Sequence, residues 1–177
     1  PWRVQEASQA ALEEQCRELT LHLIEQLVTQ LGGRTLLVPL SAGRDSRLIV
    51  SAAKHLGYRN VRCFTYGRAG NFEARTSKAI AERLGYEWTF VPATIGKHRR
   101  FFAGEDYALH LDFADSGCSL PFVQDMAPLM ELKRSGYVPD DAVIVNGNSG
   151  DFISGNHVPE SMRMPARGLS DDARWDR

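Results

Sequence analysis

Four short apolar runs constrain the fold of this chain more than any other feature of its sequence. They occupy residues 34–40, 61–66, 87–91 and 141–146 and read RTLLVPL, VRCFTY, EWTFV and DAVIVN. Almost continuous apolar runs are typical of strands that are covered on both faces. Strands that alternate with helices of 10 to 15 residues form right-handed βαβ units. The pattern therefore predicts an α/β fold with a parallel, Rossmann-like sheet flanked by helices.

The segments between these runs have helical periodicity. Residues 46–56 end before Gly57, residues 72–84 follow the N-cap candidate Asn71, and residues 121–135 end before a glycine. We expect residues 94–117 to be helical in pieces. The N-terminal helix is expected over residues 5–31, with one apolar face that comprises Leu12, Cys16, Leu19, Leu23, Leu27 and Leu31.

Composition narrows the functional classes. The chain has 177 residues, 43% of them hydrophobic, with a formal net charge of -1, which fits a globular domain and excludes a basic nucleic-acid clamp. No apolar run is long enough to cross a bilayer. The cysteines Cys16, Cys63 and Cys118 are odd in number and widely spaced, so the sequence offers no disulfide framework and no CxxC metal site. We expect a cytoplasmic protein with no membrane partner, and the near-neutral charge disfavours a nucleic-acid partner.

A loop of small and polar residues follows the first predicted strand and leads directly into a helix. In an open parallel sheet, ligands bind beyond the carboxyl ends of the strands. Small residues allow successive N–H groups to converge on an anion, and the helix N-terminus adds partial positive charge. The loop is therefore a candidate phosphate cradle formed by Ser41, Ala42, Gly43, Arg44, Asp45 and Ser46.

Asp45 needs a separate explanation, because a carboxylate repels phosphate. It can bind a divalent cation that bridges phosphate oxygens, or it can cap the helix that follows. Both interpretations stay open at this stage. The loop is not a Walker A motif, because it lacks the lysine of that motif.

The segment VPLSAGRDSR resembles the SGGxDS loop of the N-type ATP pyrophosphatases, also called the PP-loop superfamily. Within this superfamily it is most similar to the synthetase domain of asparagine synthetases. The sequence departs from the family pattern at Ala42, where the family usually has glycine. The resemblance implies that the loop binds the pyrophosphate portion of ATP.

The second predicted strand ends in Thr65 and Tyr66, which resemble the part of the family's fold whose backbone lines the adenine site. Arg68 and Glu73 follow nearby. They are candidates for contact with nucleotide or substrate, or else a solvated arginine and a first-turn glutamate that the helix dipole favours.

A second glycine-rich loop follows the fourth apolar run, over residues 146–157. It resembles the family's second acidic loop, G-x-G-x-D-E, with Gly147 and Gly150 in the loop and Asp151 at the aspartate. Phe152 stands where the family has glutamate. The resemblance implies that Asp45 and Asp151 bind Mg²⁺, while the alternative is that Asp151 only satisfies amides of its own loop.

The resemblance implies a reaction in which a small-molecule carboxylate attacks Mg·ATP, forming an acyl-adenylate and pyrophosphate, after which an amine or ammonia displaces AMP. The expected organisation is an N-terminal helix packed on the core (1–33), a nucleotide-binding domain (34–157) and an irregular tail (158–177). The family's glutaminase cysteine and catalytic lysine find no match, since the chain begins at Pro1 and its last lysine is Lys133. We therefore expect a core that lacks its flanking domains, with no assigned catalytic residue.

Two other functions remain open. One is a nucleotide-binding module without turnover, and the other is a PP-loop enzyme that adenylates a nucleic-acid base. A short basic cluster at residues 97–100 is either a binding site for an anionic partner or a solvated helix face.

Overall fold

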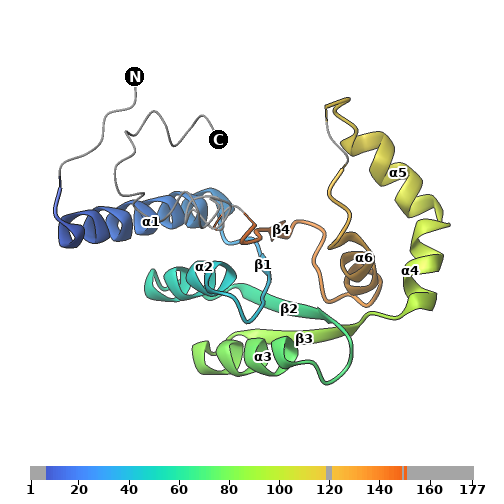
Figure 1. Cartoon of the computed structure of the whole chain (residues 1–177), viewed down its shortest axis with the longest axis horizontal. Coiled ribbons are helices and arrows are strands. Elements are labelled where there is room, and N and C mark those ends of the chain that lie inside the picture. The colour runs from blue at the N-terminus through green and yellow to red at the C-terminus, as the bar shows by residue number, and fades with distance from the viewer. Residues whose placement is uncertain (1–6, 119–120, 149, 151–177) are drawn as a thin grey trace, which may run out of the picture. The chain divides into compact units, whose positions relative to one another are not determined.

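The fold is known from a computed structural model that describes residues 7–118, 121–148 and 150. The chain divides into two compact units, Pro1–Asn146 and Gly147–Arg177, and each is considered by itself. The helices and strands labelled in Figure 1 lie in the first unit. Among the described helices, none is long and apolar enough to span a membrane.

The centre of the first unit is a parallel four-stranded sheet with the order β3-β2-β1-β4. Its strands are β1 (Leu36–Pro39), β2 (Val61–Gly67), β3 (Glu87–Pro92) and β4 (Val143–Ile144). In the register of the sheet, Leu36 lies opposite both Val61 and Val143. The predicted parallel α/β sheet is thus confirmed, although the fourth strand is shorter than the expected residues 141–146.

Within the described residues, six helices connect or flank these strands, and their positions agree with the helical periodicity of the sequence. They are α1 (Gln9–Leu31), α2 (Arg44–His55), α3 (Phe72–Leu84), α4 (Ile95–Phe102), α5 (Glu105–Ala114) and α6 (Met126–Arg134). Asn71 caps α3 as predicted, accepting a hydrogen bond from the Ala74 N–H at 2.6 Å. The helix expected from residue 121 begins only at Met126, because a turn in which the Met126 N–H donates to the Val123 carbonyl precedes it.

Alternate residues of the strands point to different layers of helices. Leu36 and Val38 pack in the same cluster as residues of α1, α2 and α3. Leu37 instead packs with Phe64 and with Leu132 of α6. Because successive side chains of a strand point to opposite faces of the sheet, α2 and α3, which follow β1 and β2, pack on one face, and α6, which precedes β4, packs on the other.

The strand order has a topological switch point beside β1. The chain moves from β1 to β2 and β3 on one side and returns to β4 on the other. Ligands of open parallel sheets bind in the crevice at the carboxyl ends of the strands at such a point. The loop that follows β1 therefore begins at the place where this fold most often binds a ligand.

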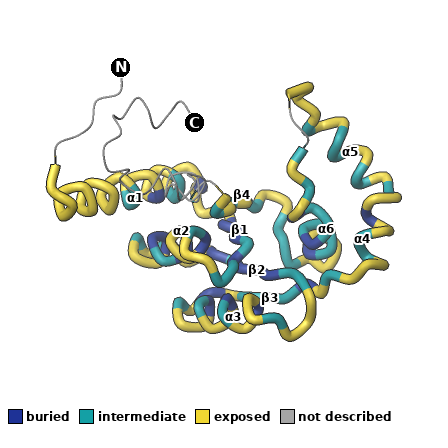
Figure 2. The backbone as a smooth tube through the Cα atoms, in the orientation of Figure 1, coloured by how far each residue is buried: buried dark blue, intermediate teal, exposed yellow. Residues whose placement is uncertain are grey.

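The face of α1 that packs differs from the predicted one. The buried or half-buried apolar residues are Leu21, Ile24, Leu27, Val28 and Leu31, whereas Leu12, Cys16, Leu19 and Leu23 are exposed. Figure 2 shows that burial is concentrated toward the C-terminal half of α1. A helix of 23 residues is roughly 35 Å long, far longer than the four-residue strand β1. Its first turns therefore extend beyond the core that the stripe was expected to cover.

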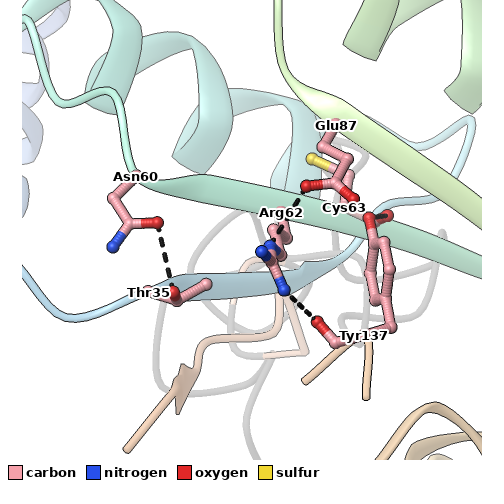
Figure 3. Close-up of polar contacts among 6 residues, drawn as sticks. All are labelled: Thr35, Asn60, Arg62, Cys63, Glu87 and Tyr137. Atoms are coloured by element: carbon pink, nitrogen blue, oxygen red, sulfur yellow. Dashed lines mark hydrogen bonds and ion pairs between the residues drawn. The ribbon is translucent and has the colours of Figure 1, made fainter. Parts of the chain in front are cut away.

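Polar contacts on the α6 side of the sheet hold β2 to its neighbours (Figure 3). The Arg62 guanidinium forms an ion pair with Glu87 of β3 at 3.1 Å and donates to the Tyr137 carbonyl. The Tyr137 hydroxyl donates to the Cys63 carbonyl at 2.9 Å. These bonds attach the segment after α6 to β2, so that the chain can return to the sheet as β4.

Cys63 leads to a prediction about stability at alkaline pH. Burial raises the pKa of its thiol to about 12, whereas the pKa of an unfolded cysteine is about 8.5. Between these values the folded protein keeps a proton that the unfolded chain loses, so the free energy of unfolding falls as the pH rises. We expect Cys63→Ala to reduce this fall by up to about 1.4 kcal/mol per pH unit above pH 9.

Urea denaturation between about pH 8 and pH 10 provides the measurement, and the tyrosines, which begin to ionise in the unfolded chain in this range, contribute equally to wild type and variant and cancel in the difference. Cys16→Ala, at an exposed cysteine, is the matched control and should keep the wild-type pH dependence. Equal slopes in wild type and Cys63→Ala would contradict the assignment.

Candidate functional site

The loop from β1 to α2 is held by its own serine hydroxyls. The Ser41 N–H donates to Ser46 Oγ at 3.1 Å, and the two hydroxyl oxygens lie 3.1 Å apart. The Gly43 N–H donates to Ser41 Oγ at 3.0 Å. Ser46 is only 4% exposed, because it turns into the loop from the first turn of α2. The predicted cradle residues are thus organised before any ligand binds.

Small side chains are needed in this loop for space rather than for an unusual backbone conformation. Gly43 has a φ of -68°, which any residue can adopt, but a Cβ there would lie 3.0 Å from Ser41 Oγ. No described residue other than glycine has a positive φ. Ala42, at the position where the predicted resemblance expects glycine, therefore has no backbone strain.

Helix α2 begins at Arg44, two residues before the predicted Ser46, and Gly43 is its N-cap. Gly43 lacks a side chain that could cap the first-turn N–H groups, so these stay available to an anion. The idea that Asp45 caps the helix is wrong, because Asp45 lies inside its first turn. Arg44 is exposed, and Arg47 donates to the Ala42 carbonyl at 3.4 Å.

The Asp45 carboxylate is half-buried and forms no hydrogen bond or ion pair with the other described residues. Its place in the first turn of α2 suits a negative charge. Within the described ranges, no group of three or more histidine, cysteine or acidic residues gathers as a metal site. A metal ion at Asp45 would thus need further oxygen ligands from a bound phosphate, from water or from Asp151.

The side chain of Thr65 has a structural role beside the loop. Its hydroxyl donates to the Leu40 carbonyl at 2.6 Å, lies 2.6 Å from Ser77 Oγ and accepts from the Trp88 indole N–H at 3.2 Å. Thr65 is 5% exposed, and Leu40 is the last residue before the loop. This side chain therefore fixes the point at which the loop leaves the sheet and is not displayed to a ligand.

Tyr66 points to the opposite face of the sheet from Thr65. Its hydroxyl donates to Oδ1 of Asp125 at 2.6 Å. Burial, together with this hydrogen bond, raises the pKa of Tyr66 well above its ordinary value, so the phenol stays a proton donor. Asp125 is 9% exposed and was not predicted as part of the site. Its sequence signal, an aspartate before an apolar segment, is indistinguishable from an ordinary helix N-cap.

The turn after β2 is tight. Gly67 has a φ of +138°, and a Cβ at that position would lie 2.8 Å from Asn71 Nδ2. The side chains of Arg68 and Glu73 make no hydrogen bond or ion pair with the other described residues, whereas the Arg68 carbonyl accepts from the Asn71 N–H at 3.2 Å. Both of their interpretations, ligand contact and solvated charge, therefore remain predictions.

The second acidic loop is described only in part. Gly147 and Gly150 are half-buried, and the Gly150 N–H donates to the Gly147 carbonyl at 3.0 Å. Both belong to the second unit, and Asp151 lies outside the described residues. The pairing of Asp45 with Asp151 accordingly stays a prediction.

Removal of the Thr65 hydroxyl should lower the free energy of unfolding substantially. Thr65→Val keeps the shape but leaves the Leu40 carbonyl and the Trp88 indole N–H without this partner in a buried environment. We expect the free energy of unfolding to fall by roughly 2 to 4 kcal/mol, measured by urea denaturation. Thr89→Val, at a half-buried threonine of β3 whose hydroxyl has no described partner, should cost less than about 1 kcal/mol. Equal effects of the two changes would refute this role of Thr65.

Comparison with known proteins supports the architecture. No protein-family model and no curated protein sequence matches the chain. Among solved structures, the chain is similar to the NH3-dependent NAD synthetase from Campylobacter jejuni subsp. jejuni NCTC 11168 in complex with the nitrate ion. The TM-score is 0.51 at 14% sequence identity, and the match covers 80% of this chain and 59% of that chain. At this identity the similarity establishes the fold alone.

Proposed function

We propose that this chain is the ATP-binding core of an amide-forming ligase of the PP-loop type, which activates a carboxylate as an acyl-adenylate and releases pyrophosphate. The observation that carries the proposal is the loop from Ser41 to Asp45. It leaves β1 at the switch point of the sheet, enters an uncapped helix N-terminus and presents an uncommitted carboxylate. An anion cradle that also contains an acid suits a metal-bound phosphate better than a free one.

The fold comparison supports the reaction class. The similar structure is an NH3-dependent NAD synthetase, and its name indicates that it uses ammonia. We therefore propose that ammonia or an amine is the nitrogen donor. The resemblance to asparagine synthetases in particular rests on the SAGRDS and NGNSGD motifs. We propose further that the second substrate is a small-molecule carboxylate.

The residues of the loop fit Mg·ATP. We propose that the N–H groups at the start of α2 and the hydroxyls of Ser41 and Ser46 bind the β- and γ-phosphates. Asp45 and Asp151 would hold Mg²⁺, which prefers carboxylate, phosphate and water oxygens. When bound, the ion supplies positive charge that stabilises pyrophosphate as a leaving group.

The chain's own groups contribute orientation and charge stabilisation. The hydroxyl oxygens of Ser41 and Ser46 accept loop N–H groups, and one of the two hydroxyls donates to the other, which leaves one hydroxyl of fixed position to donate to a phosphate. Donors of fixed position stabilise developing charge without the cost of reorganisation. The backbone beside Tyr66 would face the adenine, leaving the α-phosphorus accessible to the carboxylate.

A nucleotide-binding module without turnover is the second candidate. The observation that favours it is Phe152, which stands where the family has a glutamate. The two candidates differ in one assay. A ligase releases pyrophosphate from Mg·ATP in the presence of a suitable carboxylate, whereas a module binds Mg·ATP and releases none.

Asp45 provides the sharpest prediction for this site. With Mg²⁺ present, we expect Asp45→Asn to weaken ATP binding at least about tenfold, which corresponds to about 1.4 kcal/mol. With EDTA in place of Mg²⁺, the same variant should bind ATP as well as or better than wild type, because a charge that repels phosphate is gone. Isothermal titration calorimetry measures both affinities.

Asp112→Asn, at an exposed aspartate of α5, is the control and should bind as wild type under both conditions. Asp151→Asn should behave like Asp45→Asn if the two residues share the ion. Loss of affinity of equal size with and without Mg²⁺ would show that Asp45 acts on the loop and not on a metal ion.

A further inference from the structure

A cavity of about 660 Å³ lies at the carboxyl ends of β2 and β3, on the α6 side of the sheet. Tyr66 and residues 91–93 form its sheet side, and α4, the start of α5 and α6 form its other walls. Figure 1 shows α4 and α5 beyond the ends of β2 and β3, with α6 beside them. The volume falls within the range of sites for small molecules, about 300 to 1,000 Å³.

The charged side chains that line the cavity balance one another. Three are cationic and three are anionic, namely Lys97, Arg100, Arg134, Glu105, Asp106 and Glu131. The basic cluster of residues 97–100 is therefore not simply a solvated helix face. It contributes to a cavity whose formal net charge is zero when His98 is neutral.

Four of these six groups form two ion pairs that join the helices. Lys97 of α4 pairs with Glu131 of α6 at 2.7 Å, and Arg134 of α6 pairs with Asp106 of α5. All four side chains keep between 32% and 68% of their surface exposed. Pairs of this exposure are weak, and their unused donors and acceptors stay available to a ligand.

The other two groups, Arg100 and Glu105, make no hydrogen bond or ion pair with the rest of the described chain. They have opposite charge and lie on consecutive helices. Beneath this polar rim the walls include the apolar residues Val91, Phe101 and Pro128, all of them buried. The cavity thus combines an apolar floor with donors and acceptors of both signs.

We propose that this cavity binds an uncharged, hydroxyl-rich ring molecule of about monosaccharide size. A ligand with net charge would meet repulsion from three lining groups and attraction from the other three. A hydroxyl group avoids this conflict, because it donates to a carboxylate and accepts from a guanidinium or an ammonium group. The C–H face of such a ring can contact the apolar floor.

The proposal does not depend on the proposed nucleotide function, since neither Arg100 nor Glu105 belongs to the loop after β1. The cavity and the nucleotide candidate share only Tyr66. The two sites can therefore be tested separately, and failure of one does not imply failure of the other.

Saturation-transfer NMR and titration with D-glucose, N-acetyl-D-glucosamine and myo-inositol provide the test. We expect at least one of these neutral probes to bind with a dissociation constant of about 1 mM or tighter. Arg100→Gln and Glu105→Gln should each weaken that binding about tenfold, because each removes a charged hydrogen-bonding partner of the ring. Both positions are exposed, and urea midpoints near the wild-type value verify that the variants fold.

Arg99→Gln and Asp112→Asn are the matched controls, because they remove like charges from α4 and α5 outside the cavity lining. They should leave sugar binding unchanged, as should Asp45→Asn. The proposal is overturned if no neutral probe binds, or if binding persists undiminished in both cavity variants. It is also overturned if glucuronate or glucosamine binds at least tenfold more tightly than the neutral ring.

Discussion

The hydrogen bond from the Thr65 hydroxyl to the Leu40 carbonyl determines where the candidate site begins. Leu40 is the last buried residue before the loop, and the same hydroxyl contacts Ser77 of α3 and Trp88 of β3. One side chain of β2 therefore connects the end of β1 to the next helix and the next strand. Because the bond is buried, it does not compete with water, and the loop leaves the sheet at a fixed point. The positions of Ser41, Gly43 and Asp45 follow from that point.

Inside the loop, the serine hydroxyls are hydrogen-bonded and the carboxylate is not. Ser41 and Ser46 already serve the loop backbone, whereas the Asp45 carboxylate has no partner among the described residues. An acid without a partner beside free helix N–H groups is stabilised by the helix dipole alone. A phosphate arriving without a cation would add repulsion to that arrangement, and a phosphate that carries Mg²⁺ would remove it. This charge distribution is the reason for which we propose a metal-bound ligand.

Structural features that have a local physical cause could be predicted from the sequence. Apolar runs predicted the strands, and Asn71 marked the start of α3 through its capping chemistry. Features that depend on distant contacts were missed. Of the predicted stripe of α1, only Leu27 and Leu31 pack against the core, together with Leu21, Ile24 and Val28, because the first turns of the helix extend beyond the sheet. Asp125 could not be recognised, because its buried bond to Tyr66 spans 59 residues. The cavity was equally invisible, since the ion pairs that wall it join helices that periodicity alone cannot place together.

The strand order explains why the loop and the cavity occupy the same edge of the sheet. The connections through α2 and α3 pack on one face, and the return from β3 to β4 places α6 on the other. Parallel strands all end at one edge, so the loop after β1 and the cavity beyond β2 and β3 both open there. Consecutive residues of β2 point to these two faces, which is why Thr65 supports the loop while its neighbour Tyr66 lines the cavity. A change in the register of β2 by one residue would exchange these two side chains and disturb both sites together.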